Sequence, residues 1–523
     1  MTLREQYKTL ESERENFLSD AREYSKLTIP SLIPPDTTGR HQGLYKPFQS
    51  TGSYGVNTLA NKLLNALYPP SEPFFKFEIN TSQEELEQLD SAALEAIDSS
   101  VSAIEQDVLR EITKRGDRAS IAEALMHLIV SGNCVLSIGE SVTDYYPLQR
   151  YVCVRDGEGT LLKVILLDTL SYQTFKENNP NRTEIHQRHR GERSYDPKDI
   201  EVYTCMERKD GKWYVYEEVH GVVITDTKQV HPIDKPPYLV LRFNHIHGES
   251  YGRAYVENLY GDLRSLENLS QAMVEGAAIS ARAVFLVNPN GFTSARRFEG
   301  ARNGDVMPGV PSDVAVVQAN KGADLAVTAN QIQRLDSKLS TAFMITANTR
   351  DAERVTATEI RAVTEEVQSI LGGTYAVLSE EFQRPYVSRL VSILQRTNKI
   401  PGWPEGMIDI AIVTGTAGIG RGVDKEKLLQ FMQALQQVLG GETVQKFVNV
   451  RVAISKLAAS LGIDPSGLIR SEEDIQAEMQ SQQEMAMASK LGGPALSAMG
   501  QVASSQLQGN QNQNGNEEEQ TPS

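Results

Sequence analysis

The stretch IVTGTAGIGRG, residues 412–422, comes nearest to a nucleotide-binding turn in this sequence. In such a turn, glycines spaced as G-x-G-x-x-G follow a strand and let the backbone approach a pyrophosphate closely. Gly415, Gly418 and Gly420 do not fit this spacing, and they lie one residue short of the alternative pattern TGxxxGxG. Too little alternation of strands and helices follows to build a parallel sheet. We therefore interpret the stretch as a glycine-rich connector between helices.

Two groups of histidines could ligate a metal ion, but neither has the further ligands that a site needs. The first is a basic run whose neighbours are rich in Asn, Pro and Arg, and it contains His186, Arg188, His189 and Arg190. This composition favours a solvated loop. His245 and His247 lie two residues apart at the end of a predicted strand and share a face if the chain is extended. No third ligand is evident, so a structural role is the better interpretation.

Other catalytic signatures are missing from the sequence. It contains no G-x-S-x-G elbow, no H-E-x-x-H motif and no P-loop. The adjacent acids Glu365–Glu366 and Glu380–Glu381 lie in predicted helices, where sequence neighbours point to different faces and do not form an acid/base pair. An odd number of cysteines without C-x-x-C spacing argues against a disulfide framework or a zinc site; they are Cys134, Cys153 and Cys205. We therefore predict no catalytic residue, no cofactor and no metal.

The bulk composition narrows the class of protein. The chain has 523 residues, of which 40% are hydrophobic, and this is enough for several domains with a substantial core. Its net charge of −16 argues against tight, general wrapping of nucleic acid, which requires Lys and Arg. No apolar run reaches roughly 18 residues, so we expect no transmembrane helix. The charged N-terminus MTLREQYKTLESEREN does not have the pattern of a secretory signal.

The predicted elements indicate an α+β fold that is mainly α. Residues 1–141 have the pattern of helices interrupted by prolines. From 142 to 248 the pattern changes to strands, with period-2 alternation and the turn pairs Asp156-Gly157 and Asp210-Gly211. We expect this β-rich part to form a small barrel or a curled sheet.

A compact insert lies between two predicted helices. Apolar residues at three- and four-residue steps predict one long helix over 251–283; they are Leu259, Leu263, Leu266, Leu269 and Met273. A segment rich in Gly and Pro follows at 284–325, and a shorter helix is predicted at about 327–345. This order predicts a protruding module carried on a helical hairpin. The long helix has too few apolar positions to be buried all round, so we expect it to pack against copies of itself.

The rest of the chain is predicted to be helical and increasingly polar. A polar stretch at 346–355 precedes a long helical region, 356–398, which we expect to be kinked because it contains Gly372, Gly373 and Pro385. The low-complexity tail, 504–523, is expected to be disordered.

Several stretches together resemble the portal proteins, or head-to-tail connectors, of short-tailed bacteriophages related to the T-odd coliphages (podovirus or autographivirus type). The resemblance extends from about residue 20 to about residue 480, although the β-rich part matches in little detail and the chain diverges after about residue 425. It is carried by KLTIPSLIPPD (26–36), NTLANKLLNALYPP (57–70), GESYGRAYVENLYGDLRSLENL (248–269), AVFLVNPNG (283–291), ERVTATEIR (353–361), LGGTYAVLSEEFQRP (371–385) and TGTAGIGRG (414–422).

The resemblance implies a portal fold with wing, stem, clip and crown. The wing would consist of residues 1–248, helical to 141 and β-rich from 142, together with a kinked helix and connector at 356–422. The stem helices would be 249–283 and 326–345, with the clip at 284–325 between them and the tunnel loop at 346–355 after them. The crown would be 423–503, followed by the disordered tail at 504–523.

The resemblance also implies a non-enzymatic, dodecameric ring at one capsid vertex, assembled in the host bacterial cytoplasm and kept in the virion. Double-stranded DNA would pass through its channel without sequence specificity, inward during packaging and outward during ejection. The implied partners are the terminase large subunit, a tail adaptor or tubular tail protein, the major capsid and scaffold proteins, and internal core or ejection proteins, but no membrane. Two alternatives stay open: another structural, internal capsid or scaffold protein of a phage, and an enzyme that uses the turn at 412–422.

Three groups of residues are candidates for these roles. On the stem, we hypothesise that outward-facing charges pair between subunits and inward-facing acids keep DNA from adhering; the candidates are Arg253, Glu257, Asp262, Arg264, Glu267 and Glu275. In the tunnel loop, the residues expected to constrict the channel as a valve are Asn348, Arg350, Asp351, Glu353 and Arg354. In the clip, a basic patch could dock the terminase and adaptor, face DNA phosphates or be a plain exposed loop; it consists of Arg296, Arg297 and Arg302.

Overall fold

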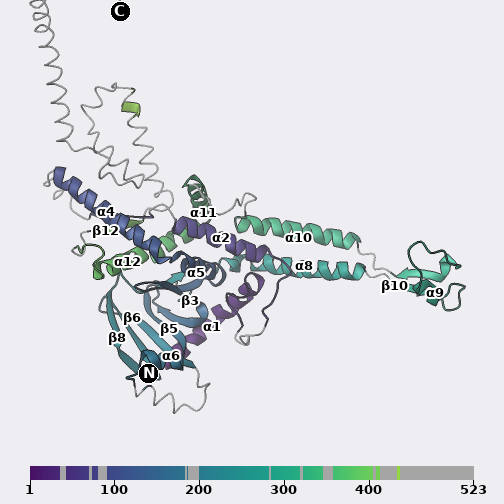
Figure 1. Ribbon diagram of the computed structural model, residues 1–523, viewed down its shortest axis with the longest axis horizontal. Coiled ribbons are helices and arrows are strands. Elements are labelled where there is room, and N and C mark those ends of the chain that lie inside the picture. Colours follow the sequence, from purple (N-terminus) through teal and green to yellow (C-terminus); the bar gives the residue numbers. More distant parts are fainter. Residues whose placement is uncertain are drawn as a thin grey trace, which may run out of the picture. The chain divides into compact units, whose positions relative to one another are not determined.

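The computed structural model describes residues 1–35, 43–69, 74–79, 91–182, 185, 199–281, 284–317, 322–345, 357–403, 408–412, 433–435 and 437. The chain divides into two compact units, residues 1–420 and 421–523, and every element named below belongs to the first (Figure 1). Several predicted features lie outside the described residues: the glycine turn with Gly415, Gly418 and Gly420, the run from His186 to Arg190, most of the expected crown, and the tail.

Helices of the N-terminal part pack around α5 (Arg118–Ser131), which contacts both α1 (Leu3–Leu27) and α2 (Thr51–Leu67). Helix α1 begins with a capping box, since the Thr2 hydroxyl accepts the Glu5 N–H and the Glu5 carboxylate accepts the Thr2 N–H. Helix α5 ends at Gly132, whose φ of +74° is the left-handed conformation that favours glycine. A further helix, α4 (Ser91–Arg115), precedes α5 in the chain.

The β-rich part forms two antiparallel sheets. The first has the order β3-β2-β9, from β2 (Asn133–Ile138), β3 (Thr143–Pro147) and β9 (Tyr238–Arg242). The second is a meander of β4 (Tyr151–Arg155), β5 (Leu161–Ser171), β6 (Asp199–Lys209), β7 (Lys212–Val219) and β8 (Val222–Pro232), with a short helix α6 (Tyr172–Asn178) after β5. The predicted hairpin turn between β6 and β7 is confirmed, because Asp210 and Gly211 both have positive φ.

The meander stays open rather than closing into a barrel. Its order runs from β4 to β8, and these two edge strands do not pair among the described residues. The edge strand β8 is also interrupted. Val215 pairs with Gln229 and Glu217 pairs with Ile224, so residues 225–228 bulge out opposite a single residue of β7. The curled sheet is therefore the better of the two predictions.

Two antiparallel helices enclose the predicted insert. Helices α8 (Tyr260–Ser280) and α10 (Gly322–Ala342) contact each other along their lengths. Helix α8 is shorter than the predicted 251–283, because a 3-10 turn at Val256–Leu259 precedes it. Between the two helices, β10 (Val284–Val287) pairs with β11 (Val314–Val317), and they are joined through α9 (Ala295–Glu299) and a 3-10 turn at Pro311–Asp313.

The kink predicted in the next long helical region is confirmed. Helix α11 (Ala357–Leu378) has a non-helical residue at Leu371, beside the glycine pair. A π-helical turn, η5 (Ser379–Gln383), separates α11 from α12 (Arg384–Arg396), which has Pro385 in its first turn. After α12, β12 (Ile408–Ile412) pairs with β1 (Phe75–Ile79).

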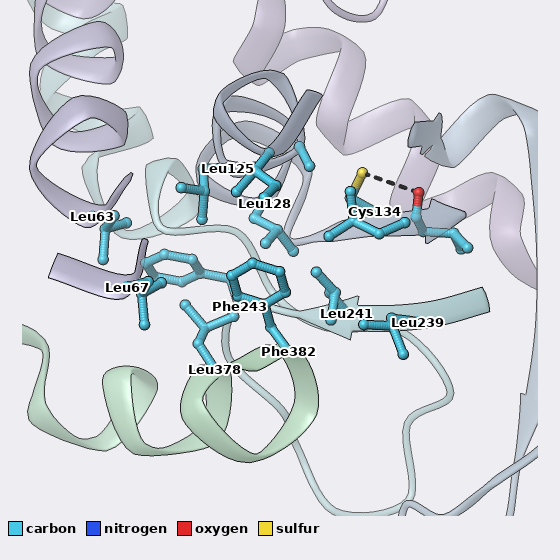
Figure 2. Packing of buried hydrophobic residues seen from close by; sticks show 14 of the residues in the cluster. Leu63, Leu67, Leu125, Leu128, Cys134, Leu239, Leu241, Phe243, Leu378 and Phe382 are labelled. Carbon is cyan, nitrogen blue, oxygen red and sulfur yellow. Dashed lines mark hydrogen bonds between the residues drawn. The ribbon is translucent and has the colours of Figure 1, made fainter. Parts of the chain in front are cut away.

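The main hydrophobic core joins these helices to the three-stranded sheet. Figure 2 shows side chains from α2, α5, β9 and α11 meeting there, among them Leu63, Leu128, Leu241 and Leu378. Phe382 of η5 packs into the same cluster, so the π-helical turn is fixed by burial.

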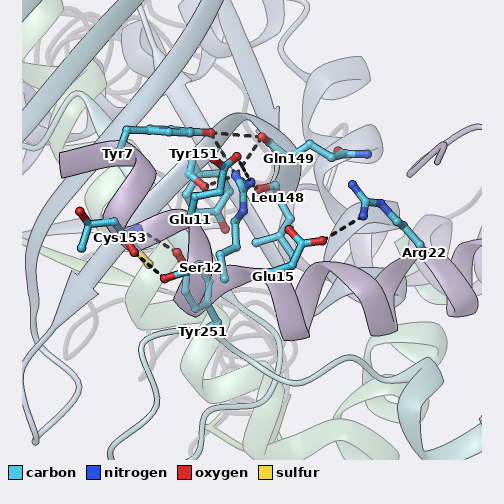
Figure 3. A network of polar contacts seen from close by, with 12 residues as sticks. Tyr7, Glu11, Ser12, Glu15, Arg22, Leu148, Gln149, Tyr151, Cys153 and Tyr251 are labelled. Atoms are coloured by element: carbon cyan, nitrogen blue, oxygen red, sulfur yellow. Dashed lines mark hydrogen bonds and ion pairs between the residues drawn. The ribbon is translucent and has the colours of Figure 1, made fainter. Parts of the chain in front are cut away.

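A polar network fixes α1 on the meander, and Figure 3 shows it around Tyr7, Glu11, Gln149 and Tyr151. The Arg14 side chain is almost fully enclosed, and its Nη1 donates to the Tyr7 hydroxyl at 3.0 Å and to the carbonyls of Gln149 and Tyr151 at 2.9 and 3.0 Å. Its Nη2 pairs with Glu11 at 3.0 Å. Helix α1 and the start of β4 therefore share one polar network beneath the apolar contacts of Leu3 and Tyr7.

Candidate functional site at the helical hairpin

The hairpin of α8 and α10, with the insert between them, carries the stem candidates from Asp262 to Glu275 and the three arginines expected in the clip. An ion pair joins the two helices, with Lys338 Nζ 2.7 Å from a carboxylate oxygen of Asp262. Lys338 is largely exposed, so this pair contributes little beyond orientation. Asp262 therefore has a partner within its own chain.

Glu267 of α8 lies inside the protein rather than on its surface. Only 3% of the residue is exposed. Its carboxylate accepts the Tyr45 hydroxyl at 2.6 Å, the Phe48 N–H at 3.0 Å and the Gln49 N–H at 3.3 Å. The hydrogen bond to Glu267, with some burial, raises the pKa of Tyr45 to about 12. Glu267 thus fastens residues 43–50, which we call the strap, to the hairpin at the entry to α2.

Arg253 also finds its partners within the chain, just before the hairpin. Its guanidinium pairs with Glu249 at 2.5 Å and with Glu257 at 3.4 Å, and it lies over the Phe17 ring of α1. The hydrogen bonds that Arg253 donates to Glu249, together with the negative charges of Glu249 and Glu257, raise the pKa of Arg253. These contacts tie the start of the hairpin to the N-terminal helix.

The distal half of the hairpin has few exposed charges. Residues 265–281 and 322–333 contain no Lys or Arg. Glu275 is exposed and accepts from the Gln271 amide at 2.9 Å, and Asp324 is exposed on α10. The surface of the distal half is accordingly neutral to weakly acidic, with apolar side chains such as Val274 and Val327 in solvent. Arg264 is exposed nearer the proximal end of α8.

The basic patch of the insert is exposed. Arg296 and Arg297 lie on α9 and Arg302 follows it, all three open to solvent. Phe298 of the same short helix packs edge-to-face on Phe285 of β10, with 5.2 Å between ring centroids. This stacking positions α9 on the β10–β11 ribbon, and with it the arginines.

The end of α10 is fixed firmly on α2. Phe343 is fully buried and lies against Gly55, where a Cβ would come within 2.4 Å of the ring. The Tyr255 hydroxyl donates to the Ala342 carbonyl at 2.6 Å. Met344, which follows Phe343, has a φ of +56°. The residues expected to form the tunnel loop come directly after this anchor and lie outside the described residues: Asn348, Arg350, Asp351, Glu353 and Arg354.

The histidine pair and the three cysteines, which the sequence offers as candidates for chemistry, do not come together in a site. His245 and His247 are exposed in a loop. Cys134, Cys153 and Cys205 are free and buried, and burial raises the pKa of each thiol. Within the described ranges, no group of three His, Cys, Asp or Glu residues is arranged to hold a metal ion. None of the helices that the structure describes is long and apolar enough to span a membrane.

The adjacent acids predicted to lie on helix faces are divided between different partners. Glu366 pairs with Lys62 of α2, and Glu381 pairs with Arg242 of β9, each at 2.6 Å. Glu380 is on the exposed side, 3.9 Å from Arg384. These carboxylates hold helices and strands together and do not converge on a shared site.

The sequence pattern is sufficient to predict that Glu267 is buried, but not which groups its carboxylate binds. Glu267 follows Leu263 by four residues and therefore lies on the buried face of α8, which predicts its burial. Its partners in the strap are more than 200 residues away in sequence and carry no comparable signal.

Comparison with known proteins gives one consistent result. The family described as "Bacteriophage head to tail connecting protein" matches residues 1–469. The chain is 35% identical to the portal protein of Enterobacteria phage T3 over 515 residues, covering 96% of this chain and 95% of that protein. It is equally identical to the portal protein of Escherichia phage T7 over 508 residues, covering 95% and 93%.

A more distant likeness is to a solved structure described as the neck of a native gene transfer agent particle computed with C12 symmetry. It has 10% identity and a TM-score of 0.35, and it covers 75% of this chain and 88% of that one. At this TM-score the likeness carries no conclusion about this chain.

Proposed function

Because this chain belongs to the family of bacteriophage head-to-tail connecting proteins, we propose that it assembles into a dodecameric ring at one capsid vertex, with a central channel for double-stranded DNA. As a portal protein it is a structural component of the virion at the junction of head and tail. DNA enters through the ring during packaging and leaves through it during ejection.

The observation that carries the proposed channel is the charge of the α8–α10 hairpin. A duplex presents about one negative charge per 1.7 Å of its axis, and Lys and Arg side chains bind it by displacing counterions. The distal half of the hairpin contains no Lys or Arg over residues 265–281 and 322–333, and it exposes Glu275 and Asp324. Where the distal half lines the channel, it offers the phosphates no cation, so DNA can slide past it. The exposed cations of the two helices, Arg264, Arg334 and Lys338, belong to the proximal half.

Contacts within the chain reduce the number of stem charges that are free to contact DNA or a neighbouring subunit. The sequence suggests that outward-facing charges pair between subunits, but Arg253, Glu257 and Asp262 already have partners within the chain. Glu267 is buried. Glu275 and Arg264 are therefore the members of this group that we propose for contact with DNA or with a neighbouring subunit.

The ring also serves as a docking platform in this proposal. The insert binds the terminase large subunit during packaging and a tail adaptor protein afterwards, while scaffold, capsid and internal proteins contact other faces. Assembly takes place in the host cytoplasm. The tunnel loop, residues 346–355, constricts the channel and retains packaged DNA.

The first test is negative-stain electron microscopy of the purified protein together with native mass spectrometry. Rings with a central hole and near twelvefold symmetry support the proposal. A homogeneous monomer or dimer, even after addition of scaffold protein, contradicts it.

The valve is tested separately by a chain shortened at 347–354. Since α10 and α11 are anchored on α2 independently of this loop, the shortened protein is expected to form rings and package DNA but to lose the DNA afterwards. Normal retention would show that the loop is not the valve.

A further inference from the structure

The insert contains two Asn-Gly pairs whose surroundings differ. They are Asn290–Gly291 and Asn303–Gly304, and both asparagine side chains are exposed. An Asn-Gly pair is prone to deamidation, because glycine has no side chain that would keep its backbone nitrogen away from the preceding side-chain amide. The rate at each pair therefore depends on whether this nitrogen is free of hydrogen bonds and free to move.

The Asn290–Gly291 pair is held in a rigid loop. The Gly291 N–H donates to the Asn288 carbonyl at 3.0 Å, and the Asn290 N–H donates to the Asn288 side chain at 3.1 Å. Gly291 also lies so close to Asp313 that a Cβ there would be 2.4 Å from the carboxyl carbon. The Thr293 N–H donates to the same carboxylate at 3.0 Å. The Gly291 nitrogen can therefore attack the Asn290 amide only after this loop opens.

The Asn303–Gly304 pair occupies the centre of an exposed turn. The Asp305 N–H donates to the Arg302 carbonyl at 3.0 Å and Gly304 has a φ of +90°, so residues 302–305 form a type II turn. Neither the Gly304 N–H nor the Asn303 side chain has a hydrogen bond to a residue that the structure describes. Nothing lies within 4 Å of the Cβ position at Gly304. The attacking nitrogen and the amide are thus both accessible here.

We propose that Asn303 is a site of spontaneous deamidation, which adds one negative charge to the insert of each chain that reacts. The Gly304 nitrogen attacks the side-chain carbonyl carbon of Asn303 and forms a cyclic imide. The bond from that carbon to the amide nitrogen breaks, and the amide nitrogen leaves as ammonia with the proton that the Gly304 nitrogen loses. Water then opens the imide to aspartate or isoaspartate, so one water is taken up for each ammonia released.

The reaction changes the part of the insert that carries its three arginines. The new carboxylate lies next to Arg302 in the chain, and Arg296 and Arg297 are exposed on the preceding helix α9. Isoaspartate also adds one carbon to the backbone between Arg302 and Asp305, and it thereby disturbs the spacing of the two hydrogen bonds that close the turn. The chemistry takes place within one chain and requires no partner, so it does not depend on the proposed ring.

The test follows both pairs in the full-length protein by peptide mass spectrometry during incubation at mildly alkaline pH. Trypsin places the two pairs on different peptides, because it cleaves at the arginines between them. Conversion at Asn303 is expected to be about fivefold faster than at Asn290 or more, the factor that one net hydrogen bond supplies. A third pair, Asn514–Gly515, lies outside the described residues and is the reference for the reaction in the same sample.

Two further comparisons separate the effect of the structure from that of the neighbouring sequence. In urea the rates at Asn290 and Asn303 are expected to become similar. Asp313→Ala removes the carboxylate that holds the loop, so it should accelerate the reaction at Asn290 and leave the rate at Asn303 unchanged. Ser312→Ala, at the exposed neighbouring residue, is the matched control and should alter neither rate.

Three results would overturn the proposal. The first is conversion at Asn303 that is no faster than at Asn290 in the folded protein. The second is conversion at Asn514 while Asn303 stays intact. The third is a difference between Asn303 and Asn290 that persists unchanged in urea, since it would then arise from the neighbouring sequence and not from the fold. An Asp313→Ala protein with an unchanged rate at Asn290 would contradict the protection assigned to the loop.

Discussion

Lys62 of α2 and Glu366 of α11 form an ion pair, with Nζ 2.6 Å from Oε2. The Lys62 side chain is 11% exposed and the Glu366 side chain 33%, so water screens the pair only in part. Phe343, at the end of α10, packs on Gly55 of the same helix α2. Helix α2 therefore holds the chain on both sides of residues 346–356.

A double-mutant cycle on this pair tests the role of α2. Lys62→Met and Glu366→Gln are expected to show a coupling of about 1 kcal/mol, because the pair is partly buried. The free energy of unfolding is obtained from urea denaturation of the two single variants, the double variant and the wild type. The exposed pair Arg110–Asp107 is the control, with expected coupling near zero. Equal coupling at both pairs would contradict the anchoring role.

Replacing Glu267 should loosen the strap. Glu267→Ala removes an acceptor shared by a hydroxyl and two backbone N–H groups, which is expected to cost about 2–3 kcal/mol. The measurements are the melting temperature and the rate of protease cleavage within residues 43–50. Glu275→Ala, an exposed acid on the same helix, should change neither. A Glu267→Ala protein as resistant as the wild type would show that the strap does not depend on this carboxylate.

A methyl group at Gly55 should be tolerated poorly. Its Cβ would lie 2.4 Å from the Phe343 ring, so Gly55→Ala is expected to cost about 1–3 kcal/mol through overpacking. Gly261→Ala is the matched control, since nothing lies within 4 Å of its Cβ position in α8. That variant is expected to be neutral or to stabilise the helix by about 0.5–1 kcal/mol. Thermal unfolding of both variants decides the matter, and similar melting temperatures would contradict the close packing.

Stability should fall as the pH is lowered from about 6.5 to about 4. Burial lowers the pKa of His127 and of His231 to about 4, and Arg389, whose Nη1 lies 3.1 Å from His231 Nδ1, adds to the effect at His231. Near pH 6.5 the unfolded chain already takes up protons at these residues, while the folded chain does not. The folded state therefore loses on the order of 1–3 kcal/mol per histidine across this window.

Melting temperatures at pH 7.5, 5.5 and 4.5 measure this loss. In His231→Gln the drop between pH 7.5 and 4.5 should be smaller than in the wild type, whatever the stability of the variant at pH 7.5. Identical drops in both proteins would show that His231 does not contribute.

Much of the fold follows from local patterns in the sequence. The Asp210-Gly211 turn sets two residues at positive φ and thereby joins β6 to β7. The glycine pair and Pro385 mark the interrupted helical region that the structure places at Leu371 and at the π-helical turn. Each of these signals acts over a few residues, so a single sequence is sufficient to detect it.

The partners of charged side chains depend on distant segments and could not be predicted in this way. Helical spacing places Glu267 beside Leu263, but it does not show that the strap supplies two backbone N–H groups. The pairing of Arg253 with Glu249 was within reach, since the two are four residues apart, whereas its contact with Phe17 joins distant elements. Whether a sheet closes into a barrel also depends on distant segments. The period-2 pattern of residues 142–248 is equally compatible with a barrel and with the open meander that the structure shows.

The interrupted edge of β8 bears on how the protein behaves before it assembles. An uninterrupted edge strand of eleven residues is a template for strands of other chains and promotes aggregation. Here Thr227 accepts the Glu217 N–H at 3.0 Å and donates to the Ile224 carbonyl at 2.8 Å, so the bulge is held by its own hydrogen bonds. Only short stretches of regular edge are left on either side of it. The bulge therefore removes the long, regular edge through which β8 could pair with a strand of another chain, and it lowers the tendency of separate chains to aggregate through this sheet.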